Sequence, residues 1–191
     1  MKQIKSRKSL HASRAQSVFW VDDPFYLEAW YALHTKSRHE QTVYDQLVSK
    51  GHESFLPKLE RWSRRTDRRQ KIRVPMFSGY VFVKTTLAPE RYLPVLRTTG
   101  VVRAVGFGGR PAPIDPEQIQ SLKILVDSGK AIHPADHLTE GEMVEIVDGP
   151  FKGVAGRLVG RRSKKRLLVW LETINQGVYV ELEEGSLRKA V

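Results

Sequence analysis

Residues 141–160 read GEMVEIVDGPFKGVAGRLVG, and this stretch decides the fold of the C-terminal part of the chain. Val144 and Ile146 flank Glu145, which is the period of a half-buried strand. The Asp-Gly-Pro sequence at 148–150 predicts a turn. A second apolar run follows at 154–159, and the Gly156 inside it indicates a bulge, a barrel corner or a close backbone approach.

The same alternation continues towards the C-terminus. Residues 161–165 predict a polar turn, 167–171 a third strand, 175–177 another turn, and 178–182 a fourth strand. Short strands joined by tight turns indicate a small, strongly curved barrel. Val, Ile, Leu and Tyr dominate these strands, which favours a permanent barrel over a helical alternative.

Composition narrows the class of protein. The 191 residues allow one large domain or two small ones, and 40% hydrophobic residues suffice for packed cores. The net charge of +11 makes nucleic acid or another polyanion the leading partner class; a solvated basic surface is the alternative. The chain has no cysteine, which excludes disulfides and thiolate metal sites, and a cytoplasmic location is expected. No apolar run predicts a membrane span, and no secretory signal is expected.

The first half of the chain alternates strands and helices. Residues 30–35 predict a strand, and Ser37 with Glu40 has the spacing of a capping box for the helix that follows and ends at Gly51. Residues 73–83 predict a central strand in which Tyr80 and Phe82 share one face.

The next segments extend this pattern. A second helix is expected from Pro89 to a residue before Gly100, then a strand over 101–107. A third helix is expected with Asp115 as its N-cap and Gly129 at its end. The sequence therefore predicts an α+β fold, with helices packed on an antiparallel sheet. Residues 1–26 read as a basic tail and 131–139 as a linker.

A strongly basic hairpin is expected between the second strand and the central strand. Over residues 58–73 the acids are Glu60 and Asp67. The cations of this segment are Lys58, Arg61, Arg64, Arg65, Arg68, Arg69, Lys71 and Arg73. Such a tip either contacts phosphates or is simply a solvated charged surface.

Two motifs carry a family resemblance. Residues 76–83, MFSGYVFV, resemble a Phe-Pro-Gly-Tyr strand of the N-terminal (NGN) domain of NusG-type transcription elongation factors, with Ser78 in place of the proline. Residues 141–160 resemble a KOW motif in an SH3-like barrel, and the two motifs occur in the order that family uses. The resemblance covers residues 29–191 and implies a tail at 1–26, an NGN-like domain at 27–130, a linker at 131–139 and a KOW barrel at 140–191.

The resemblance implies a factor that binds RNA polymerase, suppresses pausing and termination, and recruits a second partner through the barrel. By position, Trp30, Tyr80 and Phe82 correspond to an apolar groove that binds the clamp helices of the large polymerase subunit. We expect these rings to form an uncovered aromatic patch, although strand aromatics are as often core residues.

The resemblance also implies nucleic-acid contacts. Lys36, Arg38 and Arg97 correspond to positions near the non-template DNA strand of the transcription bubble. The hairpin residues Arg64, Arg65, Arg68 and Arg69 are further candidates for contacts with DNA or nascent RNA.

The barrel is implied to bind a small-subunit ribosomal protein or the termination factor Rho through Phe151 and Ile174. General NusG factors commonly carry a phenylalanine at the position of Ile174, so this chain is expected to be a specialised paralogue that opposes termination. A monomer is expected.

Signals for catalysis are absent from the sequence. The glycines at 106–109 lack the spacing of a dinucleotide loop, and Pro134 lies between His133 and His137 with no further ligand near them. We therefore expect no enzyme activity, no cofactor and no metal site. The alternative function is that of a ribosome-associated or RNA-binding KOW protein, for which the whole first domain would be superfluous.

Overall fold

The first domain is a sheet with helices on both faces. The computed structural model describes residues 27–63, 70–135, 137, 141–160, 165–182 and 187–189. The proposed tail at 1–26 and the arginines at 64, 65, 68 and 69 lie outside these residues. The sheet has the order β2 (Ser54–Phe55), β5 (Tyr80–Thr85), β1 (Ala29–Thr35) and β6 (Val101–Ala104), and β9 (Pro113–Ile114) also pairs with β1.

Alternation along β1 and β5 separates two apolar layers. Tyr31 lies opposite Val83 in the antiparallel register, and Ala32 lies opposite Phe82. Tyr31, Leu33, Val81 and Val83 pack with buried residues of α1 (Glu40–Ser49) and α2 (Pro89–Leu96). Trp30, Ala32 and Phe82 face the other way and pack with α3 (Pro116–Asp127). The predicted separation of Tyr80 and Phe82 from Val81 and Val83 is confirmed.

The predicted capping box of the first helix is wrong. The N-cap of α1 is His39, and its side chain makes no capping hydrogen bond. The Glu40 carboxylate instead accepts a hydrogen bond of 2.7 Å from the backbone N–H of Gly79. Glu40 thus links the start of α1 to the turn before β5. The helix end at Gly51 is as predicted, with φ of +80°.

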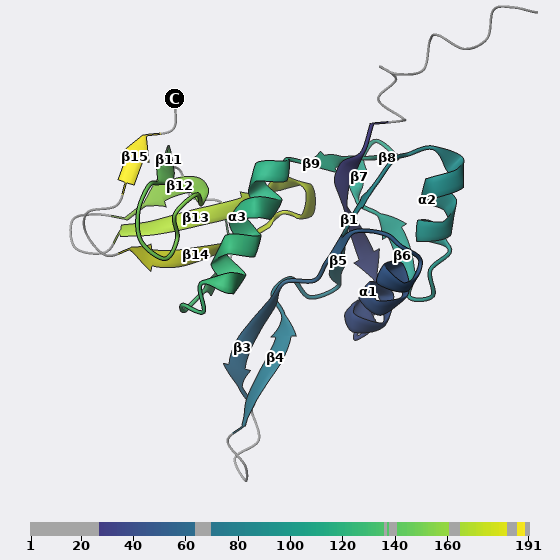
Figure 1. Ribbon diagram of the computed structural model, residues 1–191, viewed down its shortest axis with the longest axis horizontal. Coiled ribbons are helices and arrows are strands. Elements are labelled where there is room, and N and C mark those ends of the chain that lie inside the picture. Colours follow the sequence, from purple (N-terminus) through teal and green to yellow (C-terminus); the bar gives the residue numbers. More distant parts are fainter. Residues whose placement is uncertain are drawn as a thin grey trace, which may run out of the picture.

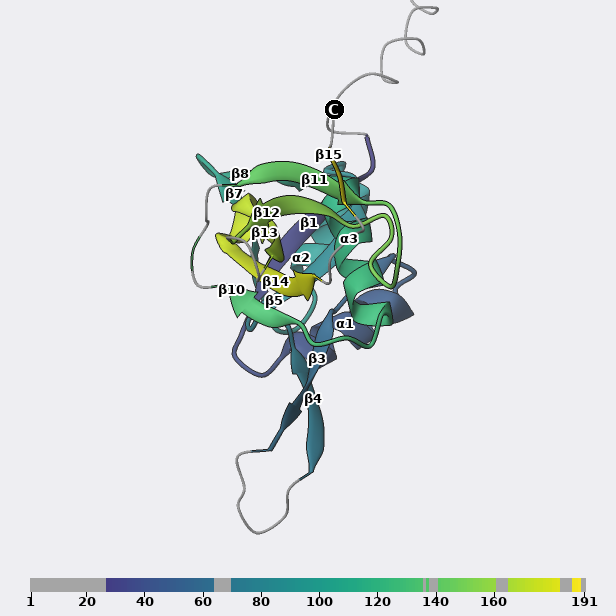
Figure 2. The same cartoon turned by 90° about the vertical axis from the view of Figure 1, so that its left-hand side faces the viewer.

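The predicted central strand over 73–83 is two strands. β3 (Lys58–Trp62) pairs with β4 (Lys71–Pro75) in a separate hairpin, and residues 76–79 turn the chain into β5. Gly79 has φ of +82°, which a continuous strand of L-residues does not accommodate. The β3–β4 hairpin projects away from the rest of the molecule (Figures 1 and 2).

The predicted strand over 101–107 is also divided. β6 ends at Ala104, and β7 (Gly106–Phe107) forms a small hairpin with β8 (Arg110–Pro111). The third helix is as predicted, because Asp115 Oδ1 accepts a hydrogen bond of 2.8 Å from the Glu117 backbone N–H. The sequence prediction of an α+β fold is confirmed.

The C-terminal domain is a strongly bent six-stranded antiparallel sheet. Its strand order is β10-β14-β13-β12-β11-β15. The strands are β10 (His133–Ala135), β11 (Glu142–Ile146), β12 (Ala155–Val159), β13 (Lys165–Leu171), β14 (Gln176–Leu182) and β15 (Leu187–Lys189), with a 3-10 turn at Glu172–Ile174. The four predicted strands are present. Two further strands were not predicted: β10, which lies within the segment proposed as a linker and pairs with β14, and β15, which pairs with β11.

Helix α3 lies between the two domains (Figure 1). Ile119, Leu122 and Leu125 belong to one buried cluster that also contains Trp30 and Phe82 of the sheet and the barrel residues Val144, Val169 and Val180. A helix that is apolar on more than one side is buried on more than one side. The core of the first domain is therefore continuous with the interior of the barrel through α3.

Candidate polymerase and nucleic-acid interface

An aromatic face lies on one side of the first-domain sheet. It consists of Trp30 on β1, Tyr80 and Phe82 on β5, and Phe55 on β2, which is opposite Phe82 in the register. The Phe55 and Phe82 ring centroids are 6.3 Å apart, and Phe77 meets Phe82 edge-on at 5.9 Å. These distances are typical of favourable aromatic pairs.

The expectation that this aromatic face is uncovered is wrong. Trp30 is 5% exposed and Phe82 is fully buried, because α3 packs on them. Tyr80 and Phe55 are half-buried and form the accessible rim of the face. Of the three predicted polymerase contacts, Tyr80 alone is partly open to a partner in this arrangement.

Charged side chains border the rim. The Lys123 ammonium on α3 lies 4.9 Å from the Trp30 ring centroid and 5.9 Å from that of Phe55. It also forms an ion pair of 3.4 Å with Glu53, and Glu53 forms another of 3.5 Å with Lys84. The hydrogen bond from Lys84 to Glu28 raises the pKa of Lys84. Such exposed ion pairs contribute little stability, so Lys123 can leave Trp30 at low cost.

His34 lies next to the rim residue Tyr80. His34 on β1 lies opposite Tyr80, and the two ring centroids are 5.6 Å apart. Among the described residues, His34 Nδ1 is buried and has no hydrogen-bond partner. A buried polar atom without a partner is costly, so it favours a ligand that supplies one.

The turn after β1 presents two of the predicted DNA contacts. Lys36 and Arg38 are exposed, and Arg38 has φ of +63°, an uncommon conformation for a residue other than glycine. The Lys36 backbone N–H donates to Gly100 O at 2.8 Å, which fixes the turn against the segment after α2. Arg97, the C-cap of α2, is exposed three residues before that contact.

Arg103 is a further cation beside Lys36 and Arg38 that the sequence analysis did not predict. It lies exposed on β6, opposite His34 in the register. Neither spacing nor a motif marks it in the sequence, because only the pairing of β6 with β1 brings it beside the rim.

The basic hairpin carries an exposed tryptophan. Trp62 is 63% exposed, and the Lys71 ammonium lies 5.9 Å from its ring centroid. Glu60 forms ion pairs with Lys71 at 3.5 Å and with Arg73 at 3.8 Å. The described part of the hairpin thus combines cations with one accessible aromatic ring.

The two predicted contacts for a barrel partner are buried. Phe151 is 8% exposed and Ile174 is 6% exposed, and both belong to the shared core. A partner contact through Phe151 would need this ring on the surface, but the 148–153 loop folds back: Gly153 N–H donates to Ile146 O at 2.8 Å. This places the phenylalanine against the barrel interior.

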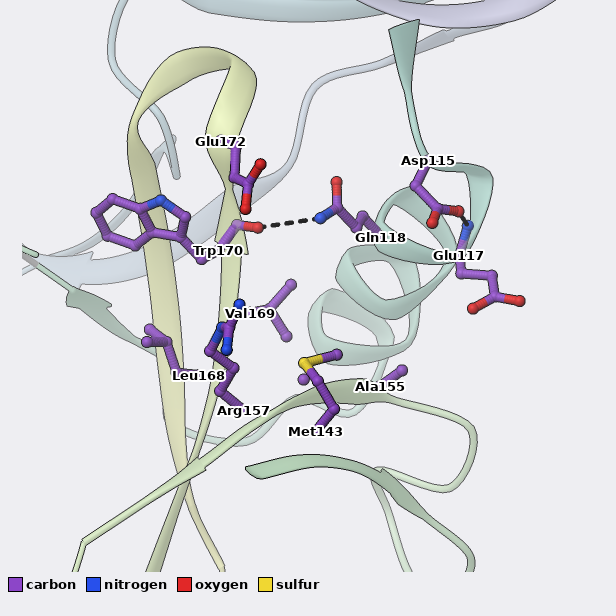
Figure 3. Close-up of a pocket in the computed structure, with 11 residues that line it drawn as sticks. Asp115, Glu117, Gln118, Met143, Ala155, Arg157, Leu168, Val169, Trp170 and Glu172 are labelled. Atoms are coloured by element: carbon purple, nitrogen blue, oxygen red, sulfur yellow. Dashed lines mark hydrogen bonds between the residues drawn. The ribbon is translucent and has the colours of Figure 1, made fainter. Parts of the chain in front are cut away.

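The contact between α3 and the barrel has polar bonds as well as apolar packing. The Gln118 side-chain amide donates to Trp170 O at 3.2 Å (Figure 3), and the Ala155 N–H donates to Ser121 Oγ at 3.0 Å. A cavity of about 250 Å³ lies between the start of α3 and strands β12 and β13. Figure 3 shows the Trp170 ring turned away from α3, whereas its carbonyl oxygen accepts the hydrogen bond from Gln118.

The described residues contain no cluster of three or more His, Asp or Glu side chains placed to hold a metal ion. Within the same residues, no helix is long and apolar enough to span a membrane.

Comparison with known proteins identifies the family. The profile described as "Transcription termination factor nusG" matches residues 28–123, half of the chain. The protein "Transcription termination/antitermination protein NusG" of Deinococcus radiodurans is 28% identical, covering 84% of this chain and 98% of its own. The protein of the same name from Staphylococcus epidermidis is 30% identical, covering 84% of this chain and 94% of its own.

Similar solved structures are more distant. The one described as "Domain interaction in Thermotoga maritima NusG" has a TM-score of 0.49 at 22% identity and covers 85% of this chain and 97% of that one. A "MjSpt4:Spt5 complex" has a TM-score of 0.31 at 18% identity and covers 84% of this chain and 97% of that one. The profile match and the relatives show that the chain belongs to the NusG family of transcription termination/antitermination factors.

Proposed function

We propose that the chain binds RNA polymerase through the aromatic face and thereby suppresses pausing and termination. The observation that carries this proposal is the half-buried rim of Phe55 and Tyr80. Lys123 borders this rim, as does His34, whose Nδ1 has no hydrogen-bond partner within the described part of the chain. Aromatic anchors that enter a partner's groove dominate the affinity of many interfaces. The clamp helices of the large polymerase subunit are the proposed partner element.

Engagement of Trp30 and Phe82 requires α3 to move. In the arrangement described here, α3 covers both rings, so the polymerase first meets the rim. We propose that the clamp helices then displace α3 together with the barrel, or separate α3 from the sheet. A ligand shifts such an equilibrium only by its differential affinity for the two arrangements. The newly exposed rings provide that difference.

Nucleic-acid contacts are proposed on the edge beside the rim. Lys36, Arg38 and Arg97 are exposed there, and we add Arg103. Phosphate contacts of this kind would restrain the non-template strand without reading its sequence. The hairpin is proposed to touch neighbouring DNA or nascent RNA, with Arg64, Arg65, Arg68 and Arg69, which lie between β3 and β4 in the sequence, as the candidate contacts.

The role of the barrel in recruitment is part of the same proposal. A small-subunit ribosomal protein or Rho remains the proposed partner of the barrel. Because Phe151 and Ile174 are buried, such a partner must bind after the loop rearranges, or must bind the surface next to these two residues. Ile174 supports a specialised paralogue. We further propose a cytoplasmic, monomeric, non-enzymatic factor.

Co-elution of the full chain with core RNA polymerase tests the polymerase site. The variant Phe55→Ala with Tyr80→Ala removes both rim rings and is expected to lose co-elution. The matched control is Tyr44→Ala, which removes a half-buried ring on α1, on the opposite face of the sheet. Circular dichroism must show that each variant is folded. A folded rim variant that still co-elutes like the control excludes the aromatic face as the binding site.

A further inference from the structure

The outer face of the barrel carries a stack of three side chains from three neighbouring strands. The His133 and Tyr179 rings are stacked with centroids 5.1 Å apart and an interplanar angle of 21°. The Arg166 guanidinium carbon lies 4.5 Å from the Tyr179 centroid. Since β14 lies between β10 and β13, Tyr179 lies in the middle of the stack.

One end of this stack is open. His133 is exposed and sits on β10, at the end of the strand order in the described sheet. His133 also borders a hollow of about 370 Å³, whose lining includes Lys130, Phe151, Asp148 and Glu181. A planar group that stacks on His133 would therefore find an apolar wall, a cation and two carboxylate acceptors next to it.

Arg166 forms the other end of the stack and belongs to a basic stretch of the sequence. Residues 157–166 contain six cations and no acid. Of these, Arg166 forms an ion pair of 3.4 Å with Glu181, which holds its guanidinium beside Tyr179. Among the described residues, Arg166 Nε has no hydrogen-bond partner. Lys165 precedes it on β13 and lies opposite Leu182 of β14 in the register.

We propose that this surface binds single-stranded nucleic acid. An unstacked base would extend the stack on the open face of His133, its N–H groups would reach the carboxylates of the hollow, and the phosphates of neighbouring nucleotides would lie against Arg166 and Lys165. Aromatic stacking beside a basic surface is the general chemistry of single-strand recognition. A duplex is disfavoured because the faces of its bases are already covered. The site is separate from the aromatic face and does not depend on polymerase binding.

NMR of the full chain can resolve this site from the basic hairpin. The chain has six histidines, so the imidazole signals can be assigned by single substitutions. Short uridine and deoxythymidine oligomers are titrated separately, with a duplex of equal length for comparison. We expect either single strand to shift the His133 signals, the duplex to leave them unchanged, and the exposed His137 to stay unchanged throughout.

Fluorescence anisotropy of the labelled single strands gives the affinity. His133→Ala is expected to weaken binding roughly five-fold or more, the lower range for loss of one stacking contact. Arg166→Gln is expected to weaken it and reduce its salt dependence, whereas His137→Ala and Lys152→Ala, exposed on the linker and on a barrel loop, serve as matched controls. Shifts confined to the Trp62 indole would overturn this inference and leave the proposed role of the hairpin intact. Unchanged affinity of folded His133→Ala would overturn it as well.

Discussion

The Ser121 hydroxyl of α3 accepts a hydrogen bond of 3.0 Å from the backbone N–H of Ala155 in β12. This bond joins the two domains directly. Ser121 is 1% exposed, and on neighbouring turns of the helix Gln118 and Ile124 contact the same barrel, Gln118 at Trp170 O and Ile124 near Gly153. One side of α3 thus belongs to the barrel, while Lys123 and the side that covers Trp30 belong to the sheet.

Removal of the Ser121 hydroxyl should destabilise the protein. Ser121→Ala leaves the Ala155 N–H without its acceptor, and an unsatisfied, poorly solvated donor costs about 1–3 kcal/mol. Urea unfolding of the full chain measures the loss. Ser49→Ala is the control, since its hydroxyl donates to Gln46 O within α1 and is exposed. Equal stability of the two variants would show that the Ser121 bond contributes nothing.

Loosening the same contact should favour polymerase binding. The double variant Gln118→Ala with Ser121→Ala removes the two hydrogen bonds described above between α3 and the barrel. Barrel residues share one buried cluster with α3, Trp30 and Phe82, so a barrel held less firmly also weakens the packing of α3 on the two rings. The fraction of open molecules then rises, and the apparent Kd falls by the same factor. A titration of core polymerase with each chain measures this. A weaker affinity in a folded double variant would mean that the covered arrangement is itself the binding form.

Glu40 should behave as a structural acceptor. Its carboxylate binds the Gly79 N–H at 2.7 Å, and the side chain is 8% exposed. Glu40→Ala should lower the free energy of unfolding by about 1–3 kcal/mol, as expected for a hydrogen bond to a charged group. Glu40→Gln keeps an acceptor oxygen and should recover most of the loss. Thermal or urea unfolding distinguishes the two, and an equal loss in both variants would point to the charge rather than to the hydrogen bond.

Local signals in the sequence predicted much of this architecture. Alternation at 80–83 gave the correct two faces of β5, and the glycine-punctuated runs after residue 141 gave the correct barrel strands. Asp115 was correctly predicted as an N-cap because that bond reaches only two residues along the chain. Each of these features depends on near neighbours.

The wrong predictions concern contacts between distant segments. Glu40 has the spacing of a capping residue, but Gly79 competes for its carboxylate from 39 residues away. Burial of Trp30, Phe82, Phe151 and Ile174 depends on where α3 and the 148–153 loop pack. β10 forms only because β14 offers it an edge. No period or motif encodes these pairings, so exposure of the candidate site could not be predicted from the sequence.

His52 should make the stability of the first domain dependent on pH. Burial lowers the pKa of His52 below its ordinary value of 6.5, and the cations Arg91 and Lys50 lower it further. The unfolded chain therefore binds the proton more readily than the folded one, and stability is lost as the pH falls through the unfolded value. We expect the free energy of unfolding to decrease between about pH 7 and about pH 5, with a smaller decrease in His52→Gln. Urea unfolding across this range measures both slopes. His137→Gln, at an exposed position, should keep the slope of the parent chain. If His52→Gln and the parent chain lose stability in parallel, another group is responsible for the acid sensitivity.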